Sequence, residues 1–562
     1  MIAGARKQIL QALVAAAHAE GMDAARLFPS LVKSLRSAGP DAIAPLANYG
    51  LGMLGATISS AAGYLGIDPA GPIPTDPSDR RFREAAWRKN PIFAWQLQAY
   101  LLGCRLLDEL IAAGDVAQTT SKKAQLAADL VKAAWSPTNF LWGNPDALKR
   151  ALETGGLSVL AGFKRFVDDA IHNRAFPSQV DASGFKIGVD LAATPGRVVY
   201  RNDLIELIQY DAQTEQTHTI PLLFSPPWIN KYYVMDLAPG KSLVEWAVRH
   251  GHTTFAISYR NPDRSMAEFT FEDYLFKGPL AAMDVIEDIT AQSRVNVVAL
   301  CLGGTLTAIL LGYLAAGGED RVNSATLLNT LIDFEDAGVL SAFTDEETLE
   351  RLETMWSREG TLKAESMQRT FDVLRPRDLI FNYVGPGWLM GDPPPAFDIL
   401  AWNADGTAMP AAMHIAYLRS CYLENRLAKG KLDFGGRTVD LTRVVADVFA
   451  VGAENDHIAP WTNTYMTTQL LPKAKVSYVL SSAGHIAGVV NPPSPKANYR
   501  LGDGYPKEPK EWRAKSVLVQ ESWWEAWSRW ISVRSGDLGD PPPIGSDRFP
   551  PLEPAPGTYV LG

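Results

Sequence analysis

Two patterns of hydrophobic and polar positions divide this chain. Up to about residue 184 the apolar residues recur at helical spacing, and Pro-rich breaks such as 71–77 interrupt them. From about Phe185 short β-branched runs alternate with helical stretches, and the first expected strands are 197–200, 204–210, 220–225, 253–259 and 295–300. Strands that alternate with helices indicate a mostly parallel sheet covered by helices. The pattern therefore predicts a helical domain, residues 1–184, followed by an α/β domain, residues 185–562.

The strand rhythm disappears between residue 331 and about residue 436. This segment carries helical stretches and a middle part rich in Pro and aromatic residues, including Trp388 and Trp402. It separates the strand 295–300 from the next strand-like run at 444–451. An insertion at this place predicts a cap subdomain, about 331–436, which would exclude water from the end of the sheet.

The candidate chemistry begins at Cys301, where the apolar run 295–300 stops and a helical pattern begins. Ala299 and Gly303 are small enough for a strand and a helix to pass closely, so the segment reads as a nucleophile elbow with sulfur in place of oxygen. The positive end of the helix would favour the thiolate, and the backbone N–H of Leu302 would hold a developing oxyanion. A buried structural cysteine is the alternative, because the usual motif begins with Gly rather than Ala.

Two later positions supply partners for this thiol. Asp456 follows the run 444–451, and His485 follows the strand-like run 476–480. Cys, Asp and His in this order, each just past a strand, match the chain order of the α/β-hydrolase triad. Taken singly, such an Asp is more often a turn residue and such a His a packing residue. His457 is a rival base beside Asp456, but neighbours in an extended loop point apart, so we favour His485.

Longer motifs extend this pattern from about residue 79 to the end of the chain. They lie at 226–233, 258–263, 375–383, 397–403, 455–461, 484–493 and 553–560. Together they resemble the polyhydroxyalkanoate synthases, bacterial enzymes that polymerise 3-hydroxyacyl-CoA into storage polyester. The resemblance implies an α/β-hydrolase fold with Cys301 as nucleophile, Asp456 as catalytic aspartate and His485 as general base. Ala299 departs from the family's usual Gly, and Tyr259 stands where the family commonly has Trp.

The activity implied by the resemblance is acyl transfer through a covalent acyl-cysteine. The expected substrate is (R)-3-hydroxyacyl-CoA, above all 3-hydroxybutyryl-CoA. The long single chain, its helical amino-terminal domain and its ending at 553–560 resemble those of the single-subunit, short-chain (class I-like) synthases. CoA is the leaving group, and we expect no separate cofactor and no metal. Asp456 would orient His485 or assist deprotonation of the substrate hydroxyl. Ile229 or Trp228, after the strand 220–225, would supply the second oxyanion N–H.

Composition narrows the range of functions. A chain of 562 residues is too long to fold around a single hydrophobic core of ordinary size, which predicts at least two domains. A net charge of -9, without a basic and aromatic cluster, argues against nucleic-acid binding. The three cysteines fit neither metal spacing nor a fully paired disulfide set, which predicts a reducing cytoplasm. No apolar run reaches the roughly twenty residues of a transmembrane helix.

The expected partners follow from the resemblance. In the family the amino-terminal helical domain is associated with dimerisation and granule attachment, so we expect a homodimer at the surface of polyester granules, together with granule-associated proteins. The apolar segment 51–67 suits such a contact, although ordinary helix packing would explain it as well. Trp523, Trp527 and Trp530 share one helical face, and we expect a final helix packed on the sheet rather than polymer contact.

Two other functions fit part of the pattern. A cysteine-dependent α/β-hydrolase, such as an esterase, a dienelactone hydrolase or a polyester depolymerase, would share the triad but admit water. A granule-coating protein could have kept the fold without the chemistry, although the complete triad argues against this. The product separates the two enzymes, because a hydrolase releases free hydroxy acid and a synthase forms insoluble polymer.

Overall fold

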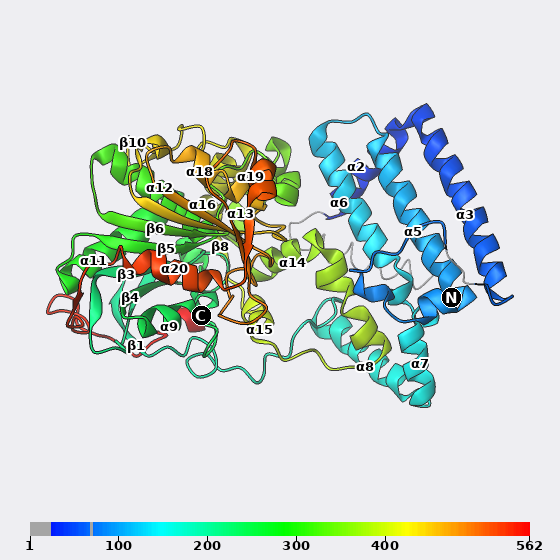
Figure 1. The fold of residues 1–562 in the computed structure, drawn as a ribbon, viewed down its shortest axis with the longest axis horizontal. Coiled ribbons are helices and arrows are strands. Elements are labelled where there is room, and N and C mark those ends of the chain that lie inside the picture. The colour runs from blue at the N-terminus through cyan, green and yellow to red at the C-terminus, as the bar shows by residue number, and fades with distance from the viewer. Residues whose placement is uncertain (1–23, 68–70) are drawn as a thin grey trace. The chain divides into compact units, whose positions relative to one another are not determined.

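The computed structural model describes residues 24–67 and 71–562, and its contacts divide the chain into two compact units (Figure 1). The first, which we call the helical unit, comprises Met1–Asp181 and Gln368–Ala396. The second, the α/β unit, comprises Ala182–Met367 and Phe397–Gly562. From the sequence we had assigned 368–396 to the cap, whereas its neighbours in the structure belong to the helical unit.

The described part of the helical unit is built from helices that follow the predicted apolar spacing. The main ones are α2 (Ala24–Ser37), α3 (Ile43–Gly63), α5 (Pro91–Ala112), α6 (Gln118–Ala134), α7 (Pro145–Glu153) and α8 (Leu157–His172). Asn90 accepts hydrogen bonds from the first N–H groups of α5, and Asn144 does the same for α7. Such side-chain caps satisfy amide groups that have no partner inside a helix.

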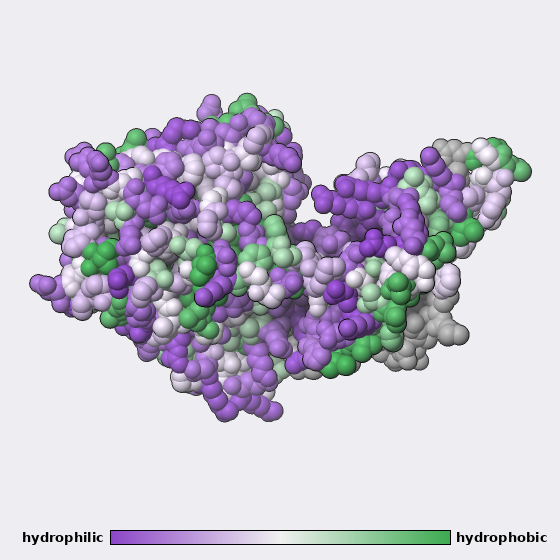
Figure 2. Space-filling model, turned by 90° about the horizontal axis from the view of Figure 1, so that it is seen from below, coloured by the Kyte–Doolittle hydropathy of each residue, from purple (hydrophilic) through white to green (hydrophobic). Residues whose placement is uncertain are grey.

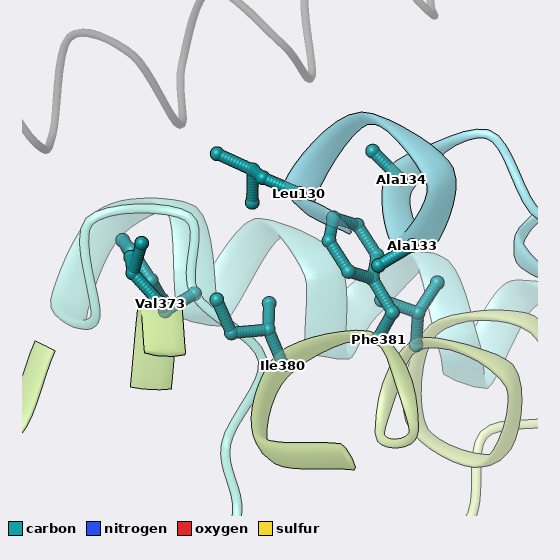
Figure 3. Close-up of a cluster of buried hydrophobic side chains, with 8 residues drawn as sticks. Leu130, Ala133, Ala134, Val373, Ile380 and Phe381 are labelled. Atoms are coloured by element: carbon teal, nitrogen blue, oxygen red, sulfur yellow. The ribbon is translucent and has the colours of Figure 1, made fainter. Parts of the chain in front are cut away.

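The segment 368–396 packs on the helical unit through a small apolar core (Figure 3). Val373, Ile380 and Phe381 lie against Leu130, Ala133 and Ala134 of α6. Phe176 and Val384 complete the cluster. Trp388 strengthens the attachment, because its Nε1 donates to Asp169 at 2.7 Å and its ring meets Phe166 edge-on at 5.0 Å. Side chains about two hundred positions apart therefore form one core.

The α/β unit contains a mixed sheet of 11 strands in the order β1-β2-β4-β3-β5-β6-β11-β12-β13-β14, with β15 beside β3. The strands are β1 (Gly196–Arg201), β2 (Ile205–Tyr210), β3 (Thr217–Ser225), β4 (His252–Tyr259), β5 (Val295–Leu300), β6 (Val322–Leu328), β11 (Asp447–Ala453), β12 (Val476–Ser481), β13 (Tyr499–Leu501), β14 (Val517–Val519) and β15 (Leu538–Gly539). All pairs from β4 to β12 are parallel. The predicted α/β class is confirmed, and β6, the antiparallel strands β13 and β14 at one edge, and β15 beside β3 are additions to the prediction.

Two helices next to this sheet matter for the site. α12 (Leu302–Gly317) begins directly after β5 and is capped at its end by Gly318 in a left-handed conformation. α20 (Trp523–Ser532) buries Trp527, whose Nε1 donates to the Thr326 hydroxyl of β6 at 2.9 Å. The expectation of a final tryptophan helix packed on the sheet is therefore confirmed (Figure 1).

Helical segments fill the region between β6 and β11. They include α13 (Glu346–Glu359), α14 (Ala364–Leu374), α15 (Asp398–Ala404) and α16 (Ala411–Tyr417). Across the described stretches 24–67 and 71–562, no helix combines the length and apolar character that a membrane span requires.

Candidate active site

Cys301 occupies a tight bend between β5 and α12. Its backbone angles are φ 51° and ψ -115°, a conformation that residues other than Gly rarely adopt. Its N–H donates to the Leu328 carbonyl of β6 at 2.8 Å, and its carbonyl accepts from Thr305 at 3.0 Å. Backbone strain of this kind costs on the order of 1–3 kcal/mol and persists where the surroundings enforce it. The bend is the geometry expected of a nucleophile elbow.

Small residues allow this bend to form beside β3. A Cβ added at Gly303 would lie 2.1 Å from the Ser225 carbonyl oxygen and 2.5 Å from that of Pro226. Only Gly therefore fits where α12 crosses the end of β3. Ala299 is fully buried and keeps Ser225 as its partner in the parallel register. The methyl group at Ala299 is thus accommodated without a break in the pairing of β5 with β3.

The predicted aspartate and histidine lie beyond adjacent parallel strands. Asp456 follows β11 and His485 follows β12, and the His485 Nδ1 lies 2.6 Å from the Asp456 Oδ2. The other carboxylate oxygen of Asp456 accepts the N–H groups of Ile458 at 2.8 Å and Ala459 at 2.9 Å. Both Asp456 and His485 are buried. The carboxylate is therefore held by the backbone on one side and faces the imidazole on the other.

The imidazole of His485 also meets the thiol. Burial by itself disfavours the charged ring, but the negative charges of Asp456 and Cys301, together with hydrogen bonds to both, hold the pKa of His485 well above its usual value. Cys301, His485 and Asp456 consequently form one line of hydrogen-bonded side chains, with His485 in the middle. Such a line can move a proton from sulfur to nitrogen and stabilise the resulting imidazolium.

The sequence also nominated Leu302, Trp228 and Ile229 as backbone donors. Leu302 is the first residue of α12, so its N–H belongs to the amide groups at a helix N-terminus that lack an intrahelical partner. Trp228 and Ile229 follow β3, which is the direct neighbour of β5. Trp228 is buried, and its carbonyl accepts from the Thr407 hydroxyl at 3.1 Å. The loop after β3 and the start of α12 thus leave the sheet from neighbouring strands.

Two tyrosines near the thiol were not identified from the sequence. Tyr417 ends α16, and Tyr422 lies in the π-helical segment that follows, Leu418–Leu423. Burial is the main cause that raises the pKa of each phenol, and the charge of Cys301 adds to the effect on both. Tyr417 also packs edge-on against Trp228, with ring centroids 5.5 Å apart. Only an enrichment in aromatic residues signalled this cover in the sequence.

No cluster of three or more His, Cys, Asp or Glu side chains suited to a metal ion occurs in 24–67 or 71–562. The three cysteines are free thiols.

Comparisons with known proteins identify the family of this chain. A family model described as the poly-beta-hydroxybutyrate polymerase (PhaC) N-terminus matches residues 78–247, and one described as the alpha/beta hydrolase fold matches residues 240–492. A poly(3-hydroxyalkanoate) polymerase of Methylorubrum extorquens is 42% identical over 86% of this chain and 81% of its own length. The poly(3-hydroxyalkanoate) polymerase subunit PhaC of Cupriavidus necator is 40% identical over 86% of this chain and 83% of its own length. Poly(3-hydroxyalkanoate) polymerase 1 of Ectopseudomonas oleovorans is 39% identical over 86% of this chain and 86% of its own length.

Proposed function

This chain belongs to the poly(3-hydroxyalkanoate) polymerase family, and from that membership we propose that it joins (R)-3-hydroxyacyl units, above all 3-hydroxybutyryl units, from their CoA thioesters and releases CoA. Its enzyme class is acyl transfer on an α/β-hydrolase fold. The observation that carries the proposed mechanism is the line from Cys301 through His485 to Asp456 at a strained strand-to-helix bend.

The first half-reaction loads the cysteine. Because Nδ1 of His485 is bonded to Asp456, its Nε2 is the nitrogen that takes the proton from Cys301. The thiolate attacks the thioester carbonyl, the bond from that carbon to the CoA sulfur breaks, and the imidazolium returns its proton to the CoA thiolate. One thioester replaces another, so acyl-Cys301 forms in a nearly balanced exchange.

The second half-reaction lengthens the chain. The 3-hydroxyl of a bound unit gives its proton to His485 and attacks the carbonyl of acyl-Cys301. The carbon–sulfur bond breaks, an ester forms, and the thiolate of Cys301 is regenerated beside the imidazolium. Asp456 stabilises that imidazolium and keeps the ring in the orientation that exposes Nε2.

Backbone amides would stabilise the tetrahedral intermediates of both steps. We assign the Leu302 N–H at the start of α12 as one donor, and Ile229 or Trp228 after β3 as the second. The buried Tyr417 and the ring of Trp228 favour polymer formation over hydrolysis, because an aromatic cover keeps water from the acyl-cysteine. A water-admitting hydrolase remains the alternative that the product assay must exclude.

The decisive experiment follows both products of 3-hydroxybutyryl-CoA. The purified wild-type chain should release CoA and produce turbidity from insoluble polyester, with little free 3-hydroxybutyrate. Cys301→Ala should abolish CoA release, because no other group in the line can accept the acyl unit. Cys104→Ala is the matched control, since this second free cysteine lies in the helical unit on α5.

Three outcomes of these assays would contradict the proposal or its controls. Normal turnover by Cys301→Ala would refute the assignment of the nucleophile. Stoichiometric free hydroxy acid without turbidity would show a hydrolase. A loss of activity in Cys104→Ala equal to that in Cys301→Ala would show that the assay reports folding rather than chemistry.

We also propose that the enzyme works in the cytoplasm at the surface of its polyester product. Helix α3 contains no Asp, Glu, Lys or Arg, and three of its apolar side chains at helical spacing are largely exposed: Leu51 at 68%, Leu54 at 58% and Ile58 at 61%. Ala56, on the opposite side of α3, is buried, and the Ser60 hydroxyl on that side donates a hydrogen bond to the Pro91 carbonyl of α5. Hydrophobic residues reach the surface of the helical unit in Figure 2. Such a face suits an apolar polymer.

A sedimentation assay tests this contact. The triple variant Leu51→Lys, Leu54→Lys and Ile58→Lys should leave most of the enzyme in the supernatant when it is mixed with poly-3-hydroxybutyrate particles, whereas the wild-type chain should pellet with them. Val445→Lys, Val517→Lys and Leu518→Lys, which replace exposed residues of the α/β unit, form the control. If both variants pellet as the wild type does, α3 is not the contact.

A further inference from the structure

Asn329, directly after β6, is linked by hydrogen bonds to the segments that carry Asp456 and His485, and its neighbour Leu328 is linked to Cys301. Its N–H donates to the Val451 carbonyl of β11 at 2.8 Å, and β11 leads into Asp456. Its side-chain Nδ2 donates to the backbone carbonyl of His485. The preceding residue, Leu328, accepts the N–H of Cys301 at 2.8 Å. Two consecutive residues therefore tie together the elbow, the aspartate loop and the histidine turn.

The conformation of Asn329 is specialised for this place. Its φ of 44° lies in the left-handed region, which Asn tolerates better than most residues, and its side chain is fully buried. The amide oxygen Oδ1 is buried without a hydrogen-bond partner in the described part of the chain. An unpaired buried acceptor costs about 1–3 kcal/mol. The amide is thus oriented by its donor group toward His485, although its acceptor is left unpaired.

The turn that carries His485 is held from two sides. Trp523 of α20 donates from Nε1 to the Gly488 carbonyl at 2.6 Å, and Trp524 donates to the Val489 carbonyl at 2.9 Å. These bonds fix the far end of the turn, three and four residues beyond His485. Asn329 acts at His485 itself, because its partner is that residue's own carbonyl.

We propose that Asn329 is a positioning residue that sets the His485 imidazole against the Cys301 thiol. The inference rests on the proposed triad but not on the identity of the acyl substrate. Without the Asn329 amide, the carbonyl of His485 loses its buried donor and the ring can swing from the line between sulfur and Asp456. The thiolate–imidazolium pair then weakens, so the thiolate becomes scarcer at neutral pH.

The test replaces the amide and follows Cys301 directly. Asn329→Gly keeps the left-handed backbone accessible and removes the donor. The rate at which iodoacetamide alkylates Cys301 is measured against pH by peptide mass spectrometry on the full-length chain. We expect the pH midpoint of alkylation to rise by about one pH unit, which lowers the rate roughly tenfold at pH values below both midpoints. With 3-hydroxybutyryl-CoA, kcat should fall while KM changes little.

A matched control lies at the other end of the same strand. Asn323 of β6 donates from its side-chain amide to the Arg534 carbonyl at 2.6 Å, far along the sheet from the elbow. Asn323→Gly should lower the unfolding midpoint but leave the pH profile of Cys301 as in the wild type. Asn329→Ser, which keeps a shorter donor, should shift the profile in the same direction by less than Asn329→Gly, and it replaces the glycine variant if that chain does not fold.

The outcomes separate this inference from the proposed function. A profile for Asn329→Gly, or for Asn329→Ser, that coincides with the wild type would overturn the positioning role and leave Asn329 as a structural residue. A shifted profile supports the role even if the wild-type chain makes no polymer, in which case the proposed reaction fails while the positioning of His485 stands.

Discussion

The side chain of His485 is buried between two groups that carry negative charge in the working site. Burial alone would lower the pKa of an imidazole, yet Asp456 and Cys301 together raise it. The raised pKa means that the ring readily holds the proton that it takes from sulfur. The strained backbone of Cys301 completes the pair, because it directs the thiol out of the sheet toward that ring.

Replacing Asp456 by Asn tests whether the charge of Asp456 raises the pKa of His485. The amide removes the charge that favours the imidazolium, so the pKa of His485 should fall and CoA release should drop about a thousandfold. Histidine labelled with carbon-13 in the ring would report the pKa by NMR, and CoA release would report the rate. Asp440→Asn is the control, since the Asp440 carboxylate accepts from Thr442 in the segment before β11. Unchanged turnover in Asp456→Asn would remove this residue from the triad.

The packing of helices against strands brings Cys301, His485 and Asp456 together. α12 can start at Leu302 only because Gly303 lets it approach the end of β3. α20 contributes Trp523 and Trp524, whose hydrogen bonds hold the turn after His485. The reactive groups come from loops, but their placement comes from packed strands and helices.

Gly303→Ala should separate α12 from β3. The added methyl would lie 2.1 Å from the Ser225 carbonyl, and a backbone atom cannot move aside without shifting the strand. We expect a loss of about 1–3 kcal/mol in the free energy of unfolding, together with a fall of more than tenfold in CoA release. Urea unfolding and the CoA assay measure the two effects.

Gly317→Ala serves as the comparison at the other end of α12. There the added methyl meets the guanidinium of Arg437 and the carboxylate of Glu319, and both are the ends of flexible side chains that can move aside. This variant should keep both stability and turnover. Equal losses in both variants would show that the crossing at Gly303 has no special role.

The stability of the α/β unit as a whole should depend on pH through its buried histidines. His252 is buried beside His218 and Trp527, and neither of its ring nitrogens has a hydrogen-bond partner in the described structure. Burial, with a smaller contribution from His218 and His250, lowers the pKa of His252 to about 3. Burial likewise lowers the pKa of His414 to about 4.

The sign of the effect follows from proton uptake. Between pH 6.5 and about 4 the unfolded chain binds protons at both positions and the folded chain does not, so stability falls as the pH falls. Each histidine can contribute a slope of up to about 1.4 kcal/mol per pH unit. His252→Phe should make urea unfolding midpoints less sensitive to pH in this window, whereas replacing the exposed His172 should change nothing. Parallel pH dependences for His252→Phe and the wild type would contradict this assignment.

The sequence by itself determined the local parts of this protein. The bend at Cys301, the start of α12 and the strand β5 each follow from a pattern of a few neighbouring residues. The order of Cys301, Asp456 and His485 could also be read along the chain, because each residue follows a recognisable strand. Steric rules for strands, glycines and helix starts act over short distances, so they leave a trace in the local sequence.

Only the tertiary structure decided which distant segments meet. The grouping of 368–396 with α6, the two tyrosines near Cys301 and the bonds of Asn329 all join residues far apart in the chain. Trp388 and Asn329 show no local mark that distinguishes them from ordinary aromatic or polar residues. Their partners are selected by how whole surfaces fit and by which buried polar groups still need a hydrogen bond, and these are properties of the folded chain.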